Sequence, residues 1–135
     1  MLGVCLLVAG VTRAALPTTE FSVAWTHSVE KTRWEEHYRI EGDGIALVEA
    51  GVQGFGAGME PPPGAELHDG WWRWRPKSDA TRELRLTYSS FTADYSICWR
   101  RHCNELGDVL GQRPLEGDVI GLQACELREP KPVTR

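Results

Sequence analysis

The stretch FSVAWTHSVEKTRWEEHYRI, residues 21–40, decides the fold because its apolar side chains recur at every second position in two runs. The first run consists of Phe21, Val23 and Trp25. The second run consists of Trp34, Tyr38 and Ile40. Alternation with a period of two is typical of half-buried strands. The short polar segment between the runs predicts that the two strands pair as an antiparallel hairpin.

Further strand signals follow this hairpin. The segment Glu41-Gly42-Asp43-Gly44 has the residues of a tight turn, and residues 45–52 are rich in Ile, Leu and Val. Five glycines and three consecutive prolines within residues 51–64 predict an irregular loop. Strands are also expected at residues 71–74, 84–88, 95–99 and 119–125. About seven strands, with at most a turn or two of helix within residues 104–110, predict an all-β, mainly antiparallel sandwich or small barrel.

Composition limits the domain count and the classes of partner. The 135 residues include 15 basic and 19 acidic side chains, which gives a formal net charge of -4. Since no long basic block is present to neutralise phosphates, we expect no nucleic-acid partner. Length and composition predict one β-rich domain over residues 15–129, followed by a flexible tail at residues 130–135.

The N-terminal segment has the pattern of an export signal. Residues 2–11 form an apolar and glycine run, and small residues follow at Ala14 and Ala15. The run is about half as long as the roughly 20 residues that a spanning helix needs, so no stable membrane span is expected. We therefore expect residues 1–14 to be a signal peptide and the mature protein to be periplasmic or secreted.

Removal of this leader would take Cys5 away and leave three cysteines in an oxidising compartment. Cys103 follows a polar turn and Cys125 ends the last expected strand, so these two are the favoured disulfide pair. A bond between Cys98 and Cys103 remains open. The cysteines lack a CxxC spacing and do not indicate zinc, and neither a metal nor another cofactor is expected.

Two polar side chains interrupt the apolar faces of the predicted hairpin. Alternation places both His27 and Glu36 inward. A buried carboxylate without a partner costs several kcal/mol, so Glu36 needs a partner, a proton or a cavity, and His27 is the nearest candidate partner. The pair is either a structural link that fixes the hairpin register or a site for a ligand, a metal or a general base.

Two other segments are candidates for binding. Residues 54–60 could present successive backbone N–H groups to an anion, but the Lys and Ser/Thr of a phosphate-binding loop are missing, which favours a turn-making role. Trp71, Arg73 and Arg75 share one face of an expected strand. They predict either an interaction surface or arginines that pack over a tryptophan in an edge strand.

The string His27-Ser28-Val29-Glu30-Lys31-Thr32, followed by Trp34, Glu36, Tyr38 and Gly56-Ala57-Gly58-Met59, resembles the domain of unknown function 1850 family. The match is most specific at the candidate ligand-binding residues His27, Ser28, Glu30, Glu36, Gly56 and Gly58. Genes of this family often lie beside those of tripartite, periplasmic-binding-protein-dependent uptake systems for organic anions. The resemblance therefore implies an accessory role in the cell envelope.

The expected function is a non-enzymatic periplasmic accessory or binding module of a solute uptake system. Its expected partners are a transporter or solute-binding protein and a small organic anion. Ser28 beside His27 does not indicate a serine hydrolase, because adjacent strand residues point to opposite faces. One alternative is a metal-assisted hydrolase that uses His27 and Glu36, with Glu30 or His37 nearby. The other is an envelope structural or assembly protein that presents the Trp71, Arg73 and Arg75 surface.

Overall fold

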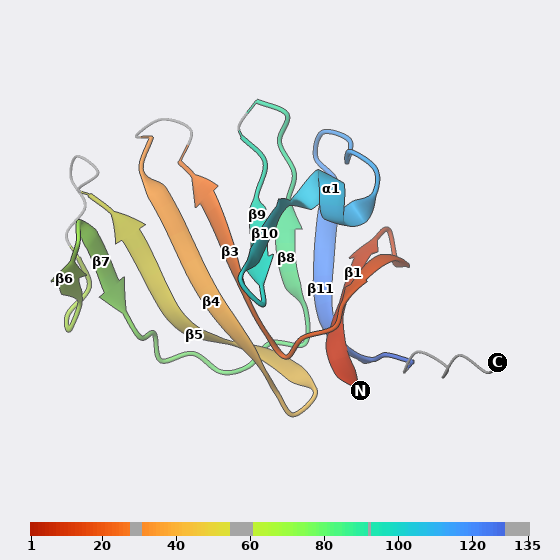
Figure 1. Ribbon diagram of the computed structural model, residues 1–135, viewed down its shortest axis with the longest axis horizontal. Coiled ribbons are helices and arrows are strands. Elements are labelled where there is room, and N and C mark those ends of the chain that lie inside the picture. Colours follow the sequence, from red (N-terminus) through yellow and green to blue (C-terminus); the bar gives the residue numbers. More distant parts are fainter. Residues whose placement is uncertain (28–30, 55–60, 92, 129–135) are drawn as a thin grey trace.

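The structure is a computed structural model that describes residues 1–27, 31–54, 61–91 and 93–128. The described residues form eleven strands and one short helix (Figure 1). In chain order these are β1 Leu2–Val8, β2 Val11–Leu16, β3 Glu20–Thr26, β4 Arg33–Glu41, β5 Gly44–Gln53, β6 Glu66–His68, β7 Trp71–Trp74, β8 Leu84–Thr87, β9 Ser96–Trp99, β10 His102–Glu105, α1 Leu106–Leu110 and β11 Val119–Glu126.

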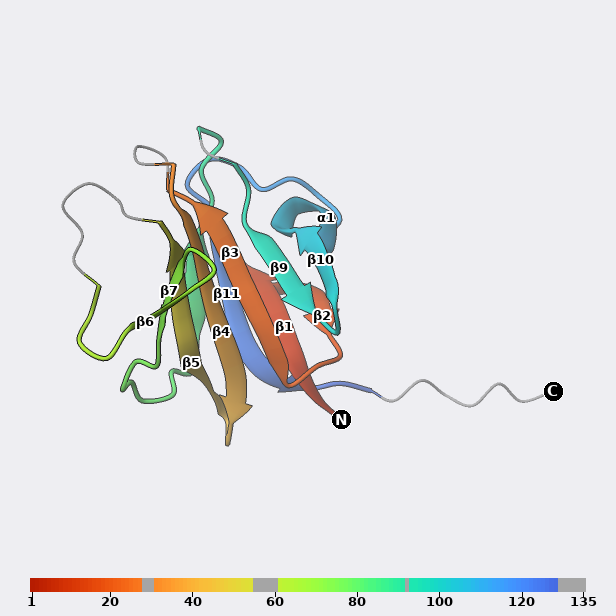
Figure 2. The same ribbon diagram turned by 60° about the vertical axis from the view of Figure 1, so that its left-hand side comes forward.

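The described strands form two sheets, and the pairings between them are antiparallel (Figures 1 and 2). The short sheet has the order β2-β1-β11-β8, and the long sheet has the order β10-β9-β3-β4-β5-β7-β6. This arrangement confirms the predicted all-β, sandwich-like fold. The seven expected strands are present, and β1, β2, β6 and β10 are additional.

The predicted hairpin lies at the centre of the long sheet. β3 pairs with β4 so that Val23 faces Glu36 and Trp25 faces Trp34. Gly42 and Asp43 form the tight turn between β4 and β5, and the positive φ of Gly42, 61°, is a conformation that glycine adopts readily. The meander β3-β4-β5 therefore follows from local sequence alone.

The core lies between the sheets. The short sheet contributes Val4, Leu6, Ile120 and Leu122, which are fully buried. The long sheet contributes Phe21, Val23, Tyr38, Ile45 and Ile97, and α1 contributes Leu106. Each such aliphatic or aromatic side chain contributes about 1.5–3 kcal/mol when it is fully buried. Because apolar and polar residues alternate on β3, β4 and β9, the long sheet has one apolar face, and this face packs on the short sheet.

The N-terminal segment forms two of the four strands of the short sheet. β1 lies between β2 and β11, and its register pairs Leu2 with Glu126 and Val8 with Ile120. The sequence analysis interpreted residues 1–14 as a signal peptide and therefore expected no strand there. An apolar run of this length has the same composition in a leader and in a buried strand, so periodicity alone does not separate the two.

The disulfides differ from the favoured prediction. Cys125 is bonded to Cys5, with 5.9 Å between their Cα atoms, and Cys103 is bonded to Cys98. The expected Cys103 to Cys125 bond is wrong, because assigning Cys5 to a leader removed the partner of Cys125. The pairing that had remained open, Cys98 with Cys103, joins residues that face each other across β9 and β10. Among the described residues, no helix has the length and apolar character that a membrane crossing requires.

Candidate functional site

The long sheet extends beyond the short sheet at β7 and β6 (Figure 1). On its inner face, aromatic rings line up in the order Tyr95, Trp25, Trp34 and Trp74, which we call the aromatic row. Neighbouring ring centroids are 6.1, 6.3 and 6.4 Å apart along the row. All four side chains are only half-buried. The row therefore forms an apolar surface at the margin of the core.

Glu36 lies on β4 on the same face as this row. It faces Val23 of β3 and Ala50 of β5, and its neighbours along the face are Trp34 and Tyr38. Burial raises the pKa of the Glu36 carboxyl above its usual value, while a hydrogen bond from Tyr38 opposes the shift. Burial and the nearby Glu36 charge also raise the pKa of Tyr38. Glu36 is thus a partly desolvated acceptor held in place by a tyrosine hydroxyl.

The structure places His27 at the end of the hairpin and away from Glu36. β3 ends at Thr26, and the His27 backbone N–H donates to the Thr32 carbonyl at 2.8 Å. Glu36 faces Val23 instead, so the hydrogen-bond ladder does not oppose His27 to Glu36. The inward direction of Glu36 agrees with the alternation. The other predicted ligand-binding residues, Ser28, Glu30, Gly56 and Gly58, lie outside the described residues.

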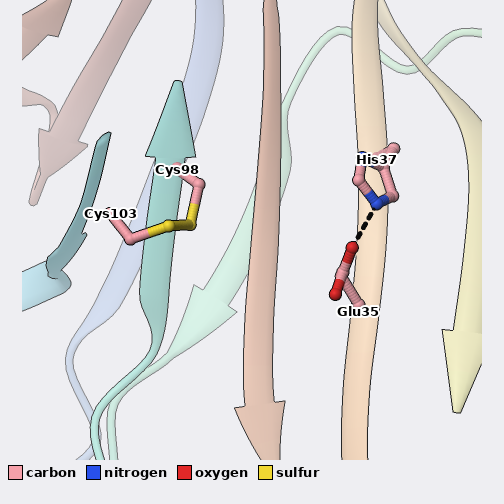
Figure 3. Close-up of a disulfide and its surroundings, with 4 residues drawn as sticks. All are labelled: Glu35, His37, Cys98 and Cys103. Atoms are coloured by element: carbon pink, nitrogen blue, oxygen red, sulfur yellow. Dashed lines mark hydrogen bonds and ion pairs between the residues drawn. A yellow bond between two sulfur atoms is a disulfide. The ribbon is translucent and has the colours of Figure 1, made fainter. Parts of the chain in front are cut away.

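The opposite face of the long sheet carries a charged cluster that the sequence did not indicate. It consists of Glu35, His37, Glu49 and Arg73, and we call it the outer charged cluster. His37 is hydrogen-bonded to Glu35 (Figure 3). The Arg73 Nη1 atom lies 3.4 Å from a Glu49 carboxylate oxygen and 3.6 Å from one of Glu35. These residues come from three strands, so only the sheet register brings them together.

Trp71 and Arg73 lie on this outer face, as the alternation predicts. The Arg73 guanidinium carbon is 5.0 Å from the centre of the Trp71 ring. Gly51 makes room for both, since a Cβ atom there would be 3.1 Å from Arg73 Nη1 and 3.3 Å from Trp71. Arg75 follows β7 and is exposed. In this geometry the Arg73 guanidinium packs over the Trp71 ring and forms ion pairs with Glu35 and Glu49 of the same sheet.

The described residues contain no group of three or more His, Cys, Asp or Glu side chains that could hold a metal ion. His37 stands beside Glu35 on the outer face, while Glu36 is on the inner face. Those described residues therefore do not assemble a metal centre around Glu36.

Comparison with known proteins gives a family but no activity. No curated protein and no solved structure matches the chain. The family model described as Domain of unknown function (DUF1850) matches residues 21–106, which run from β3 into the first residue of α1. The matched segment contains Glu36, the whole aromatic row and the outer charged cluster, and it covers more than half of the 135 residues. The chain therefore belongs to the DUF1850 family.

Proposed function

We propose that this protein is a non-enzymatic binding module of the cell envelope that serves a solute uptake system. The observation that carries the proposal is the environment of Glu36. Its carboxyl is partly desolvated, is hydrogen-bonded to Tyr38 and lies beside the half-buried aromatic row. Ligand sites commonly combine apolar and aromatic walls with a few fixed polar groups. The surface around Glu36 has this composition.

A second polar group at the same place supports a ligand. The Trp34 Nε1 atom is buried and has no hydrogen-bond partner among the described residues. Buried polar groups are nearly always satisfied, so an unpaired indole N–H needs an explanation. Trp34 and Glu36 are alternate residues of β4 and share a face. Glu36 offers an acceptor, and the Trp34 N–H would be a donor for a small organic solute, such as a hydroxy acid or an amino acid, that displaces the side chains covering it.

The envelope setting rests on the disulfides and the family resemblance. Two disulfides are compatible with an oxidising compartment outside the cytoplasm. The resemblance links such domains to uptake systems for organic anions, in which an accessory module would hold a solute or contact a transport component. Binding without turnover is the activity that this role requires.

The test is a thermal-shift series with the purified domain against hydroxy acids, amino acids and sugars. A ligand present at 100 times its Kd should stabilise the native state by about 2.7 kcal/mol. Glu36→Gln should abolish the shift. Glu35→Gln is the matched control, because it makes the same change on the neighbouring residue and the opposite face. A shift that Glu36→Gln retains, or no shift with any solute, would contradict the proposal.

A further inference from the structure

A pocket of about 320 Å³ opens on the outer face of the long sheet. It lies where Ser22 of β3 faces His37 on one side and Cys98 on the other. Figure 3 shows the disulfide and His37 on the same face, with β3 between them. The charged lining residues are Glu20, Arg39, Arg100 and Arg101. Arg39 is hydrogen-bonded to Glu41 at 2.6 Å, and Glu20 offsets one further positive charge, so the two arginines of the β9-β10 turn leave the lining with a net positive charge.

These two arginines occupy a backbone conformation that is unfavourable for them. Arg100 and Arg101 form the two-residue connection between β9 and β10, and their φ values are 50° and 67°. Positive φ at both central residues is the mark of a type I′ hairpin turn, which strongly favours Asn-Gly. Left-handed backbone is costly for residues with a Cβ atom, and such strain concentrates at functional sites. Arginine therefore occupies both positions although the turn disfavours it, which points to a role for the two arginine side chains.

The surroundings hold the turn while leaving its side chains available. The Cys98–Cys103 disulfide ties the two strands together directly before and after the turn. Both arginine side chains are exposed, and neither makes a hydrogen bond or ion pair with the described residues. The pocket thus has a fixed rim with two unpaired guanidinium groups.

We propose that this pocket binds a small organic dicarboxylate. Guanidinium groups match carboxylates in charge and geometry through paired N–H donors. Val48 supplies apolar wall, which suits a carbon chain better than an inorganic ion. The volume is near the lower end of ligand pockets, roughly 300–1,000 Å³, and so fits a small molecule. The site lies on the face opposite to Glu36 and does not depend on the function proposed for that residue.

The decisive variant is Arg100→Asn/Arg101→Gly, which installs the preferred turn sequence and removes both guanidinium groups. Isothermal titration calorimetry at low ionic strength would use malonate, succinate and glutarate as probes, with succinamide and inorganic phosphate for comparison. We expect at least one dicarboxylate to bind the wild type more tightly than phosphate does, and succinamide not to bind. The turn variant should bind that dicarboxylate at least tenfold more weakly and melt at a higher temperature, so that loss of binding is separated from loss of folding.

Arg82→Gln/Arg85→Gln is the matched control, since it removes two exposed positive charges elsewhere on the surface. Its affinity should stay within twofold of the wild type. Unchanged affinity in the turn variant would overturn the proposal. So would an equal loss in the Arg82/Arg85 control, tighter binding of phosphate than of every dicarboxylate, or no binding of any of the three probes.

Discussion

Cys5 and Cys125 join the first strand of the protein to the last across a sequence separation of 120 residues. The two cysteines lie on the neighbouring strands β1 and β11, where Gly3 faces Cys125. The second disulfide, Cys98–Cys103, spans a separation of only five residues within one hairpin. The first bond therefore restrains almost the whole unfolded chain, whereas the second restrains a single turn.

This difference predicts unequal losses of stability. In the chain-entropy account, a bond that closes a loop of this length stabilises the native state by about 5 kcal/mol, and one that closes a short hairpin by about 2 kcal/mol. Cys5→Ser/Cys125→Ser should therefore lower the free energy of unfolding more than Cys98→Ser/Cys103→Ser does. Urea denaturation of the two double variants measures this. Equal losses would contradict the entropic explanation.

Gly3→Ala tests whether the folded protein uses β1. A Cβ atom at Gly3 would lie 2.5 Å from the Leu16 carbonyl oxygen and 2.4 Å from Leu127 Cδ1. We expect a loss of about 1–3 kcal/mol in the free energy of unfolding, as for other overpacked sites. Gly121→Ala is the control, since the atoms nearest to its Cβ belong to the end of the flexible Glu83 side chain. If the mature protein began after residue 14, Gly3→Ala would have no effect, and mass spectrometry would show the shorter chain.

The sequence was sufficient for the centre of the long sheet because its signals are local. Alternation placed Phe21, Val23 and Glu36 on the inner face, and the glycine turn fixed the hairpin that follows. β1 was not recognised in the same way: β2 follows it directly, but its other neighbour, β11, comes from the opposite end of the chain, and the apolar run has the composition of a leader. An apolar segment without alternation gives no indication of which strand it pairs with.

The candidate site was predictable only in part, for the same reason. The alternation indicated that Glu36 points inward, but it did not indicate Tyr38 as its hydrogen-bond partner. The outer charged cluster depends on the register of β4, β5 and β7, with a bulge between His37 and Tyr38. Side chains that meet through pairing of distant strands leave no spacing pattern in the sequence.

Glu36→Gln should change the pH dependence of stability. Since burial raises the pKa of Glu36 in the native state above 4.5, the native state binds more protons than the unfolded state in the interval just above that pH. The contribution of Glu36 to stability is therefore fully present below about pH 4.5 and is lost as the pH rises through the native-state pKa. The free energy of unfolding of Glu36→Gln, relative to that of the wild type, should therefore increase as the pH rises through the native-state pKa of Glu36.

Urea denaturation of both proteins between pH 3.5 and pH 8 (roughly the range that brackets the transition) provides the measurement. Glu35→Gln serves as the comparison on the neighbouring residue. A stability difference between wild type and Glu36→Gln that does not change with pH would contradict the raised pKa. A difference that changes in the opposite direction would indicate that hydrogen bonding, and not burial, dominates at Glu36.

Arg73 and Arg75 should differ in their effects on stability, although they are alternate residues of one segment. Arg73 is half-buried between Glu35 and Glu49 and lies over Trp71, so its removal leaves two neighbouring carboxylates without their shared cation. Arg73→Ala should cost about 1–2 kcal/mol, from cation–π and ion-pair contributions of about 0.5–1 kcal/mol each. Arg75 is exposed, and Arg75→Ala should change stability by no more than about 0.5 kcal/mol.

A double-mutant cycle between Arg73→Ala and Glu49→Ala measures how much of that cost belongs to the ion pair. We expect a coupling of about 0.5–1 kcal/mol, because the pair is partly screened by water. Arg73→Lys should recover only part of the loss, since a single ammonium group cannot reproduce the planar guanidinium that stacks on Trp71. Zero coupling, or full recovery by lysine, would mean that the outer charged cluster does not hold Arg73 in place, and its guanidinium would then be available to a partner chain.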